Sequence, residues 1–538
     1  MSIRWVRPVV VMTAALSLSL TTVAVGAEET AATQQPLTVR LDTGLVRGSH
    51  DGENRIFSGV RYARPPVGAL RWKDPVPPER WKGVAKATAP GHECAQFGGA
   101  DGRQLSGAED CLFVNVYTPR TPSTTPRPVM VWLHGGGYTI GSGNAYDAGR
   151  LAAQGDAVVV TVNYRLGVFG YFGLPGLAGA GGFGLADQIE ALRWTQRNAA
   201  VFGGDRDNVT VFGNSAGAMS ICALLTSPAA RGLVDKAIMQ SGTCMNEWPS
   251  GTLVPVPGLP SITPYSSLRQ AHSTSGAAAT DLGCPSGRRQ LACMRAKSVE
   301  DLMPVNDRFA SHLSYGTPLL PENPAVALRK GRFLRVPVMS GGTRDENRGF
   351  ISGAIRAGIP VTASEYPVLM KAAFDAKADQ VMARYPLSQY RSAALAWATV
   401  GTDRGWACPK LTGEGLLSTR NPVYAYYLTD DEAPNVNGIP QEFPPGAAHA
   451  SELPYLFDLG GAPWPEMRPE QWKLADQMIM YWTTFARTGD PNAPGTPRWP
   501  RFSPTSDTVV SLKPGTDGIR PSDYRAEHRC EFWDEMSR

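Results

Sequence analysis

Residues 213–217 read Gly-Asn-Ser-Ala-Gly, which places one serine between two glycines. The preceding residues 209–212 form an apolar, β-branched run typical of a strand, and residues 218–225 are typical of a helix. A strand, a Gly-x-Ser-x-Gly turn and a helix form a nucleophile elbow, in which the glycines leave room for a strained serine. The pattern therefore predicts that Ser215 is a covalent nucleophile. The alternative is a chance match in a chain with 57 glycines.

A second glycine-rich segment, residues 134–138 (His-Gly-Gly-Gly-Tyr), directly follows an apolar run at residues 129–133. Glycines let the backbone approach a substrate closely and turn its N–H groups toward one point. Acyl transfer needs such donors because its tetrahedral intermediate carries a negative oxygen, and the residue after the nucleophile, Ala216, supplies another N–H group. The alternative is a phosphate-binding loop, but the segment lacks the Lys-Ser/Thr pair of a P-loop and the dinucleotide-binding spacing.

A serine nucleophile also needs a base, and the base needs a carboxylate that orients it. Downstream of the elbow the candidate bases are His272, His312, His449 and His528. His449 is favoured because residues 446–453 form a small-residue loop before an apolar segment. The candidate acids Asp345 and Glu346 follow a predicted strand, and loops at the C-terminal ends of such strands carry the site. Spacing alone does not decide which of these two acids orients the base.

Strand-like and helical segments alternate along the chain. The segments expected to form strands are residues 37–41, 46–49, 112–117, 129–133, 157–162, 209–212, 236–240 and 336–340. Helical spacing at residues 185–201 lies between two of them, and such alternation predicts an α/β fold with a mostly parallel central sheet flanked by helices. Residues 250–330 are expected to be irregular and residues 351–400 helical. We interpret both as insertions that cap the active site within a single domain.

The composition is that of a globular protein, because 42% of the 538 residues are hydrophobic and only 19% are charged. The formal net charge is +4 at pH 7, and two of these charges, Arg4 and Arg7, belong to the N-terminal leader. The rest of the chain therefore carries +2. Such a small excess gives no reason to expect a nucleic-acid partner.

The first 27 residues have the pattern of a secretory signal peptide. Arg4 and Arg7 form its charged region, residues 9–25 are apolar, and small residues precede the end of the segment. We expect cleavage after Ala27, which leaves residues 28–538 as the mature, secreted chain. The alternative is an uncleaved membrane anchor. No later stretch is apolar enough to cross a bilayer, so we expect no integral membrane segment in the mature chain.

The chain contains eight cysteines, an even number that fits an oxidising compartment. They lack the clustered Cys/His spacing of a zinc site, and no metal is expected. Spacing alone does not give the connectivity, because eight cysteines allow about 105 pairings. The alternative is that several of them are buried thiols.

Taken together, these segments resemble the type-B carboxylesterase family, which also contains the cholinesterases and has the α/β-hydrolase fold. The resemblance covers nearly all of the mature chain. Its motifs are residues 109–116, 134–138, 163–165, 202–205, 213–217 and 240–243, followed by the loops around residues 345–346 and 449.

The resemblance implies a role for several individual residues. By it, Ser215 is the nucleophile, His449 is the general acid and base, and Glu346 rather than Asp345 is the orienting carboxylate. The implied donors to the oxyanion are the backbone N–H groups of Gly136, Gly137 and Ala216, and the implied supporter of the acid is Ser241. The family also implies three disulfides: Cys94–Cys111, Cys284–Cys293 and Cys408–Cys530. Cys222 and Cys244 are outside that shared set; they form either a further disulfide or two buried thiols.

Two departures from the family pattern concern substrate choice. The family elbow usually reads Gly-Glu-Ser-Ala-Gly, whereas Asn214 replaces the glutamate here, and a neutral amide attracts no cation. The segment between Cys94 and Cys111 also contains no tryptophan, the residue with which cholinesterases hold a quaternary ammonium group. Both departures argue against a choline ester as the dedicated substrate.

The functional hypothesis from the sequence is a secreted serine carboxylesterase that hydrolyses carboxylic esters through an acyl-enzyme. Its substrate is a small-molecule or polymeric ester, and the chemistry requires no cofactor. A lipase, a polyesterase or a feruloyl-type esterase would use the same chemistry and is the closest alternative. A non-catalytic, cholinesterase-like binding protein is the alternative of another class, but such proteins typically lack the serine that this chain retains.

Overall fold

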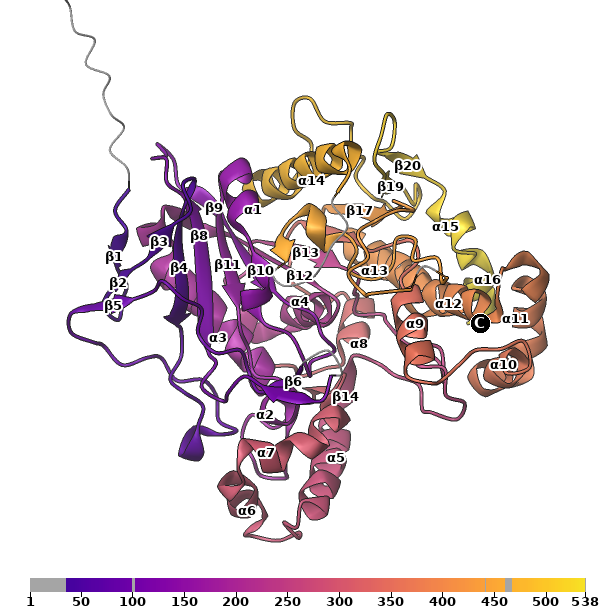
Figure 1. Cartoon of the computed structure of the whole chain (residues 1–538), viewed down its shortest axis with the longest axis horizontal. Coiled ribbons are helices and arrows are strands. Elements are labelled where there is room, and N and C mark those ends of the chain that lie inside the picture. Colours follow the sequence, from indigo (N-terminus) through magenta and orange to yellow (C-terminus); the bar gives the residue numbers. More distant parts are fainter. Residues whose placement is uncertain (1–34, 99–101, 441, 460–466, 538) are drawn as a thin grey trace, which may run out of the picture.

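The computed structural model describes residues 35–98, 102–440, 442–459 and 467–537, arranged around one large twisted sheet (Figure 1). The predicted signal peptide and its cleavage position after Ala27 lie outside the described residues. In the described part, no helix is long and apolar enough to cross a bilayer.

The large sheet has eleven strands. From one edge to the other they are β20 (Arg520–Ser522), β19 (Val509–Leu512), β17 (Val423–Leu428), β16 (Val338–Gly341), β13 (Lys236–Gln240), β12 (Gly204–Asn214), β9 (Arg127–Leu133), β11 (Val158–Val162), β8 (Phe113–Pro119), β4 (Asn54–Arg61) and β3 (Ser49–His50). Neighbours run parallel from β11 through β19, and the edge pairs are antiparallel. The prediction of a mostly parallel central sheet is confirmed.

The central strands are buried on both faces because helices cover both sides of the sheet. Along β9, Val131 packs into a cluster with residues of α3 (Phe183–Asn198) and α4 (Ala216–Thr226), while Trp132 packs on the other side. That second cluster contains residues of α1 (Gly149–Gly155) and α14 (Pro469–Thr488) (Figure 1). Alternate strand residues therefore supply two separate cores.

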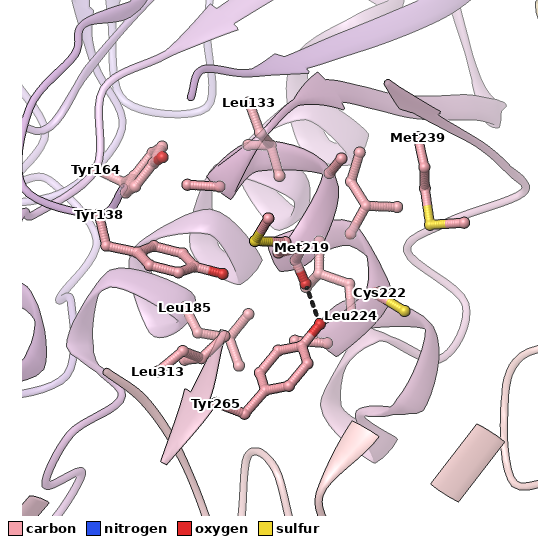
Figure 2. Packing of buried hydrophobic residues seen from close by; sticks show 14 of the residues in the cluster. Leu133, Tyr138, Tyr164, Leu185, Met219, Cys222, Leu224, Met239, Tyr265 and Leu313 are labelled. Atoms are coloured by element: carbon pink, nitrogen blue, oxygen red, sulfur yellow. Dashed lines mark hydrogen bonds between the residues drawn. The ribbon is translucent and has the colours of Figure 1, made fainter. Parts of the chain in front are cut away.

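The core beside α4 also contains tyrosines (Figure 2). Leu133, the last residue of β9, packs with Met219 of α4, and Tyr265 donates a hydrogen bond of 2.9 Å from its hydroxyl to the Met219 carbonyl oxygen. Burial of the apolar ring and a bonded hydroxyl satisfy both parts of a tyrosine. This packing fixes the helix that follows the predicted nucleophile.

Residues 250–330 contain more regular structure than expected. They form α5 (Leu268–Asp281), α6 (Gln290–Ala296), α7 (Val299–Leu302), α8 (Pro324–Arg329) and the 3-10 helix η5 (Met303–Phe309). The buried residues of α5 are three alanines and one serine, namely Ala271, Ser275, Ala278 and Ala279. Because a helix with such a face has no stripe of large apolar residues, its periodicity is weak in the sequence.

Residues 351–400 are mainly helical, as predicted. Their helices are α9 (Arg348–Arg356), α10 (Tyr366–Phe374), α11 (Ala378–Arg384) and α12 (Ala393–Thr402), and α13 (Cys408–Ser418) follows them. α2 (Gly167–Tyr171), α15 (Tyr524–Glu527) and α16 (Cys530–Met536) complete the α-helices of the described residues. Three of the remaining short strands form a sheet in the order β1 (Thr38–Arg40), β2 (Leu45–Arg47) and β5 (Val84–Lys86). The others pair as β6 (Gln96–Gly98) with β7 (Gln104–Ser106), β10 (Tyr146–Asp147) with β18 (Asp458–Leu459), and β14 (Tyr265–Ser267) with β15 (Leu313–Tyr315).

Four disulfides join all eight cysteines. They are Cys94–Cys111, Cys222–Cys244, Cys284–Cys293 and Cys408–Cys530. The first, third and fourth are the pairs that the family resemblance implies. The second answers the question that the sequence left open, and it connects α4 to the segment after β13.

Candidate active site

Ser215 lies in the turn between β12 and α4, with φ of 56° and ψ of −121°. An L-residue adopts this conformation only when its surroundings enforce it. The Ser215 N–H group donates a hydrogen bond of 2.9 Å to the carbonyl oxygen of Gln240, the last residue of the neighbouring strand. On the other side, a Cβ atom at Gly217 would overlap the carbonyl oxygen of Leu133, so the close approach of β9 requires glycine there.

The glycine-rich segment after β9 lies directly against the elbow. A Cβ atom at Gly135 would come within 3.0 Å of the Ser215 Cβ atom. Gly136 and Gly137 have φ values of 106° and 60°, in the left-handed region that favours glycine. Within the described residues, their N–H groups donate to no protein acceptor. The N–H group of Ala216, at the first position of α4, has no intrahelical partner either.

His134, the first residue of the glycine-rich segment, is fully buried and anchors the segment in the core. Its ring stacks on Tyr164 with ring centroids 4.3 Å apart, and the Tyr164 hydroxyl donates a hydrogen bond to the His134 carbonyl oxygen. Burial lowers the pKa of His134 to about 4, so its ring is neutral at pH 7. Its Nδ1 lies 2.8 Å from the Gly135 carbonyl oxygen, which only accepts, so Nδ1 carries the proton.

The two loops that carry Glu346 and His449 meet beside the elbow strand. Nδ1 of His449 lies 2.5 Å from Oε2 of Glu346, and both side chains are buried. The other carboxylate oxygen, Oε1, accepts a hydrogen bond of 2.8 Å from the Thr343 N–H group. An ionised carboxylate only accepts hydrogen bonds, so this contact holds the proton on Nδ1 and leaves Nε2 free to act as a base.

Asp345, the acid that spacing alone did not separate from Glu346, has a different set of partners. Its carboxylate accepts a hydrogen bond of 3.1 Å from the Ala447 N–H group and pairs with Arg344 and Arg348, each at 2.8 Å. Its own N–H group donates to the Ala447 carbonyl oxygen at 2.9 Å. Asp345 therefore joins the loop that carries Asp345 and Glu346 (the acid loop) to the loop at residues 446–453 that carries His449 (the histidine loop). Glu346, in contrast, contacts the imidazole.

Ser215 and His449 are connected through their neighbours. Within the described part of the chain no hydrogen bond joins the two side chains directly. Instead, Nδ2 of Asn214 donates a hydrogen bond of 2.9 Å to Oε1 of Glu452, which lies three residues after His449. The elbow and the histidine loop are thus in contact through a buried polar pair.

Comparison with known proteins identifies the family of this chain. The sequence model described as the carboxylesterase family matches residues 35–533. The chain belongs to the carboxylesterase family.

Individual relatives of this carboxylesterase cover most of its length. Para-nitrobenzyl esterase of Bacillus subtilis (strain 168) is 36% identical over 495 residues, which cover 87% of this chain and 93% of the relative. Cocaine esterase of Homo sapiens is 31% identical over 520 residues, which cover 91% of this chain and 88% of that protein. A solved structure named PNB esterase is 33% identical with a TM-score of 0.73, covering 91% of this chain and 99% of that one. The chain is a carboxylic ester hydrolase with the α/β-hydrolase fold.

Two aromatic side chains that the sequence did not single out contact the His449 ring. The centroids of the Trp406 and Phe350 rings lie 4.7 Å and 5.2 Å from it. Trp406 belongs to a π-helical turn, Asp403–Ala407, and such turns occur frequently at functional sites. Neither aromatic residue carries a sequence signal, because their relation to the imidazole depends on how α9 and the π-helical turn pack.

Ser241 of this carboxylesterase also has an unusual backbone conformation, with φ of 51°. Its N–H group donates a hydrogen bond of 2.8 Å to the Gly341 carbonyl oxygen. Its side-chain oxygen is buried and lacks a hydrogen-bond partner among the described residues, so the predicted support of the acid is not a direct hydrogen bond to Glu346. The two side chains are neighbours across Gly342, where an added Cβ atom would lie 3.6 Å from Ser241 Oγ.

Two of the other candidate histidines have partners of their own. His528 contacts Asp403 at 2.7 Å, and His312 contacts the Ala310 carbonyl oxygen at 2.6 Å. His272 lies on α5. No group of three or more histidine, cysteine, aspartate or glutamate side chains suited to a metal ion occurs in the described residues.

The close approach at Gly217 makes a prediction about stability. In a helix, replacing glycine by alanine normally stabilises by about 1 kcal/mol, but Gly217→Ala should destabilise by at least ~2 kcal/mol because its Cβ atom overlaps Leu133. Gly276→Ala in α5 is the matched control, since nothing lies within 4 Å of its added Cβ atom. Urea unfolding measures both variants. Equal stability of the two would contradict the steric explanation.

Proposed function

We propose that this carboxylesterase hydrolyses its ester by a Ser-His-Glu triad, with Ser215 as nucleophile, His449 as general base and acid, and Glu346 as the orienting carboxylate. The observation that carries the proposal is the 2.5 Å contact between His449 Nδ1 and Glu346 Oε2, beside a serine in the strained elbow conformation. The substrates are carboxylic esters of small molecules, in keeping with relatives named para-nitrobenzyl esterase and cocaine esterase. Polymeric esters are a further class that the same chemistry accommodates.

The mechanism is a double displacement. His449 removes the proton of Ser215 as the hydroxyl oxygen attacks the ester carbonyl carbon, and the N–H groups of Gly136, Gly137 and Ala216 stabilise the negative oxygen. His449 then protonates the leaving alcohol, and an acyl-enzyme remains. Water attacks this ester by the same steps, and its proton passes through His449 back to Ser215. In unliganded enzymes the hydrogen bond between nucleophile and base is often long and shortens when substrate binds.

The nucleophile is tested with Ser215→Ala. The variant should fold normally and lose about 10³-fold or more of kcat, because no other group forms the acyl-enzyme. Hydrolysis of a p-nitrophenyl ester measures the rate. A fluorophosphonate probe, followed by peptide mass spectrometry, should label the wild-type chain at Ser215. Labelling at another residue, or turnover retained in the variant, would refute the assignment.

The division of roles between neighbouring acids gives a second test. Glu346→Gln should lower kcat by about 10³-fold or more, because the imidazole loses the charge that orients it. Asp345→Asn keeps the backbone hydrogen bond from its N–H group to the Ala447 carbonyl oxygen and should keep kcat within about tenfold, while its loss of the Arg344 and Arg348 pairs lowers stability. Steady-state kinetics and thermal unfolding separate the two effects. Equal loss of kcat in both variants would argue against this division.

We further propose that the enzyme is secreted after removal of residues 1–27 and acts as one domain spanning residues 28–538. The charged and apolar pattern of the leader supports export, and four disulfides favour an oxidising compartment. N-terminal sequencing of the protein from the culture medium should begin at Glu28. A chain that still begins at Met1 would show that the leader is not cleaved.

A further inference from the structure

Close to the proposed triad lies a third carboxylate that the mechanism does not use. Glu452 is fully buried and precedes the short 3-10 helix η9 (Leu453–Tyr455) in the histidine loop. Burying a carboxylate is costly unless hydrogen-bond donors surround it. The partners of Glu452 therefore indicate what it does.

Both of its donors are amides at the ends of central strands. Oε1 of Glu452 accepts hydrogen bonds from Nδ2 of Asn214 at 2.9 Å and from Nε2 of Gln240 at 3.4 Å. Asn214 is the last residue of β12 and Gln240 the last residue of β13, and the two are paired across the sheet. The other oxygen, Oε2, is buried without a hydrogen-bond partner among the described residues.

These two amides belong to the residues that fix Ser215. Asn214 precedes Ser215 in the chain, and the carbonyl oxygen of Gln240 accepts the Ser215 N–H group. The orientation of the Gln240 amide is set by Trp482 of α14, whose indole N–H donates to Gln240 Oε1 at 3.1 Å. The Gln240 NH₂ group is thus turned toward Glu452. One carboxylate in the histidine loop contacts both residues that hold the nucleophile.

The charge of Glu452 depends on its surroundings. Burial raises the pKa of Glu452 to about 7, and the negative charge of Glu346 adds to the effect. The titratable groups that face it are Glu346, His449, Tyr146 of β10 and Tyr426 of β17. Above this pKa the carboxylate is ionised and accepts hydrogen bonds only, which suits two amide donors.

We propose that Glu452 is a positioning residue, which holds the elbow against the histidine loop by accepting a hydrogen bond from Asn214. This rests on the proposed function, because it assumes that Ser215 is the nucleophile. An acid at position 214 would place a second negative charge beside Glu452. The two carboxylates would then stay in contact only by sharing a proton. Asn214 supplies a permanent donor instead, so the contact persists when Glu452 is ionised and the enzyme keeps its activity at alkaline pH.

The test exchanges the donor for an acceptor of the same size. In Asn214→Asp, an oxygen replaces the Nδ2 that lies 2.9 Å from Glu452. At pH 9 both carboxylates would be ionised and repel each other, so kcat should fall about tenfold or more relative to wild type. At pH 6.5 one shared proton bridges the pair, and kcat should be within about threefold of wild type. The readout is the pH profile of kcat, which a general loss of packing would not change in this direction.

A second variant reverses the polarity of the contact. Asn214→Asp combined with Glu452→Gln lets the glutamine amide donate to the aspartate, and kcat at pH 9 should return to within about threefold of wild type. Asn208→Asp on the same strand is the matched control for added charge, because Asn208 Oδ1 accepts a hydrogen bond from Lys236 Nζ and not from the site. Its pH profile should equal that of the wild type.

Each outcome of these experiments either supports or overturns the proposed role of Glu452. A wild-type pH profile in Asn214→Asp, or a combined variant that is no more active at pH 9 than Asn214→Asp alone, overturns the proposal. If Asn214→Asp unfolds at pH 9, the combined variant must restore both the folded state and kcat, and its failure to do so also overturns it. Fluorophosphonate labelling separates this outcome from failure of the proposed function, because a wild-type chain unlabelled at Ser215 would disprove the triad whatever these variants do.

Discussion

The backbone of Ser215 has φ of 56° and ψ of −121°, a conformation that costs of the order of 1–3 kcal/mol and persists only under constraint. Two neighbouring strands impose it. From β13, the Gln240 carbonyl oxygen accepts the Ser215 N–H group, and from β9, the Leu133 carbonyl oxygen leaves space only for a glycine at position 217. The strain is local, but the groups that maintain it come from both sides of β12 in the sheet.

The order of the strands also brings the other groups of the proposed site to the same end of the sheet. β9, β12, β13 and β16 are consecutive and parallel, so the segments that follow them leave the sheet at one end. The glycine-rich loop follows β9, the elbow follows β12, Ser241 follows β13 and Glu346 follows β16. Ligand sites of open parallel sheets form at the carboxyl ends of the strands. The position of the site is therefore a consequence of sheet topology.

Three acids lie within or beside the proposed site, and their partners distinguish them. Glu346 contacts an imidazole, Asp345 binds two arginines and a backbone N–H group, and Glu452 accepts from two amides. In a buried environment each such contact is stronger than in water, and each missing contact costs more. The same chemical group can thus orient a base, join two loops or hold a strand end, depending on the donors around it.

The sequence by itself determined the elements whose signals are local. The apolar runs at residues 129–133, 157–162 and 236–240 are strands in the structure, and the elbow and glycine-rich loop follow from residue types within a few positions. Residue spacing left Asp345 and Glu346 open; the family resemblance implied Glu346, and the tertiary structure shows that Glu346 is the one that contacts His449. Only the tertiary structure decided that Cys222 pairs with Cys244 and that Asn214 donates to Glu452. The last of these contacts joins residues 238 positions apart. Such contacts are set by strand order and by the close packing of loops, which no periodicity along the chain encodes.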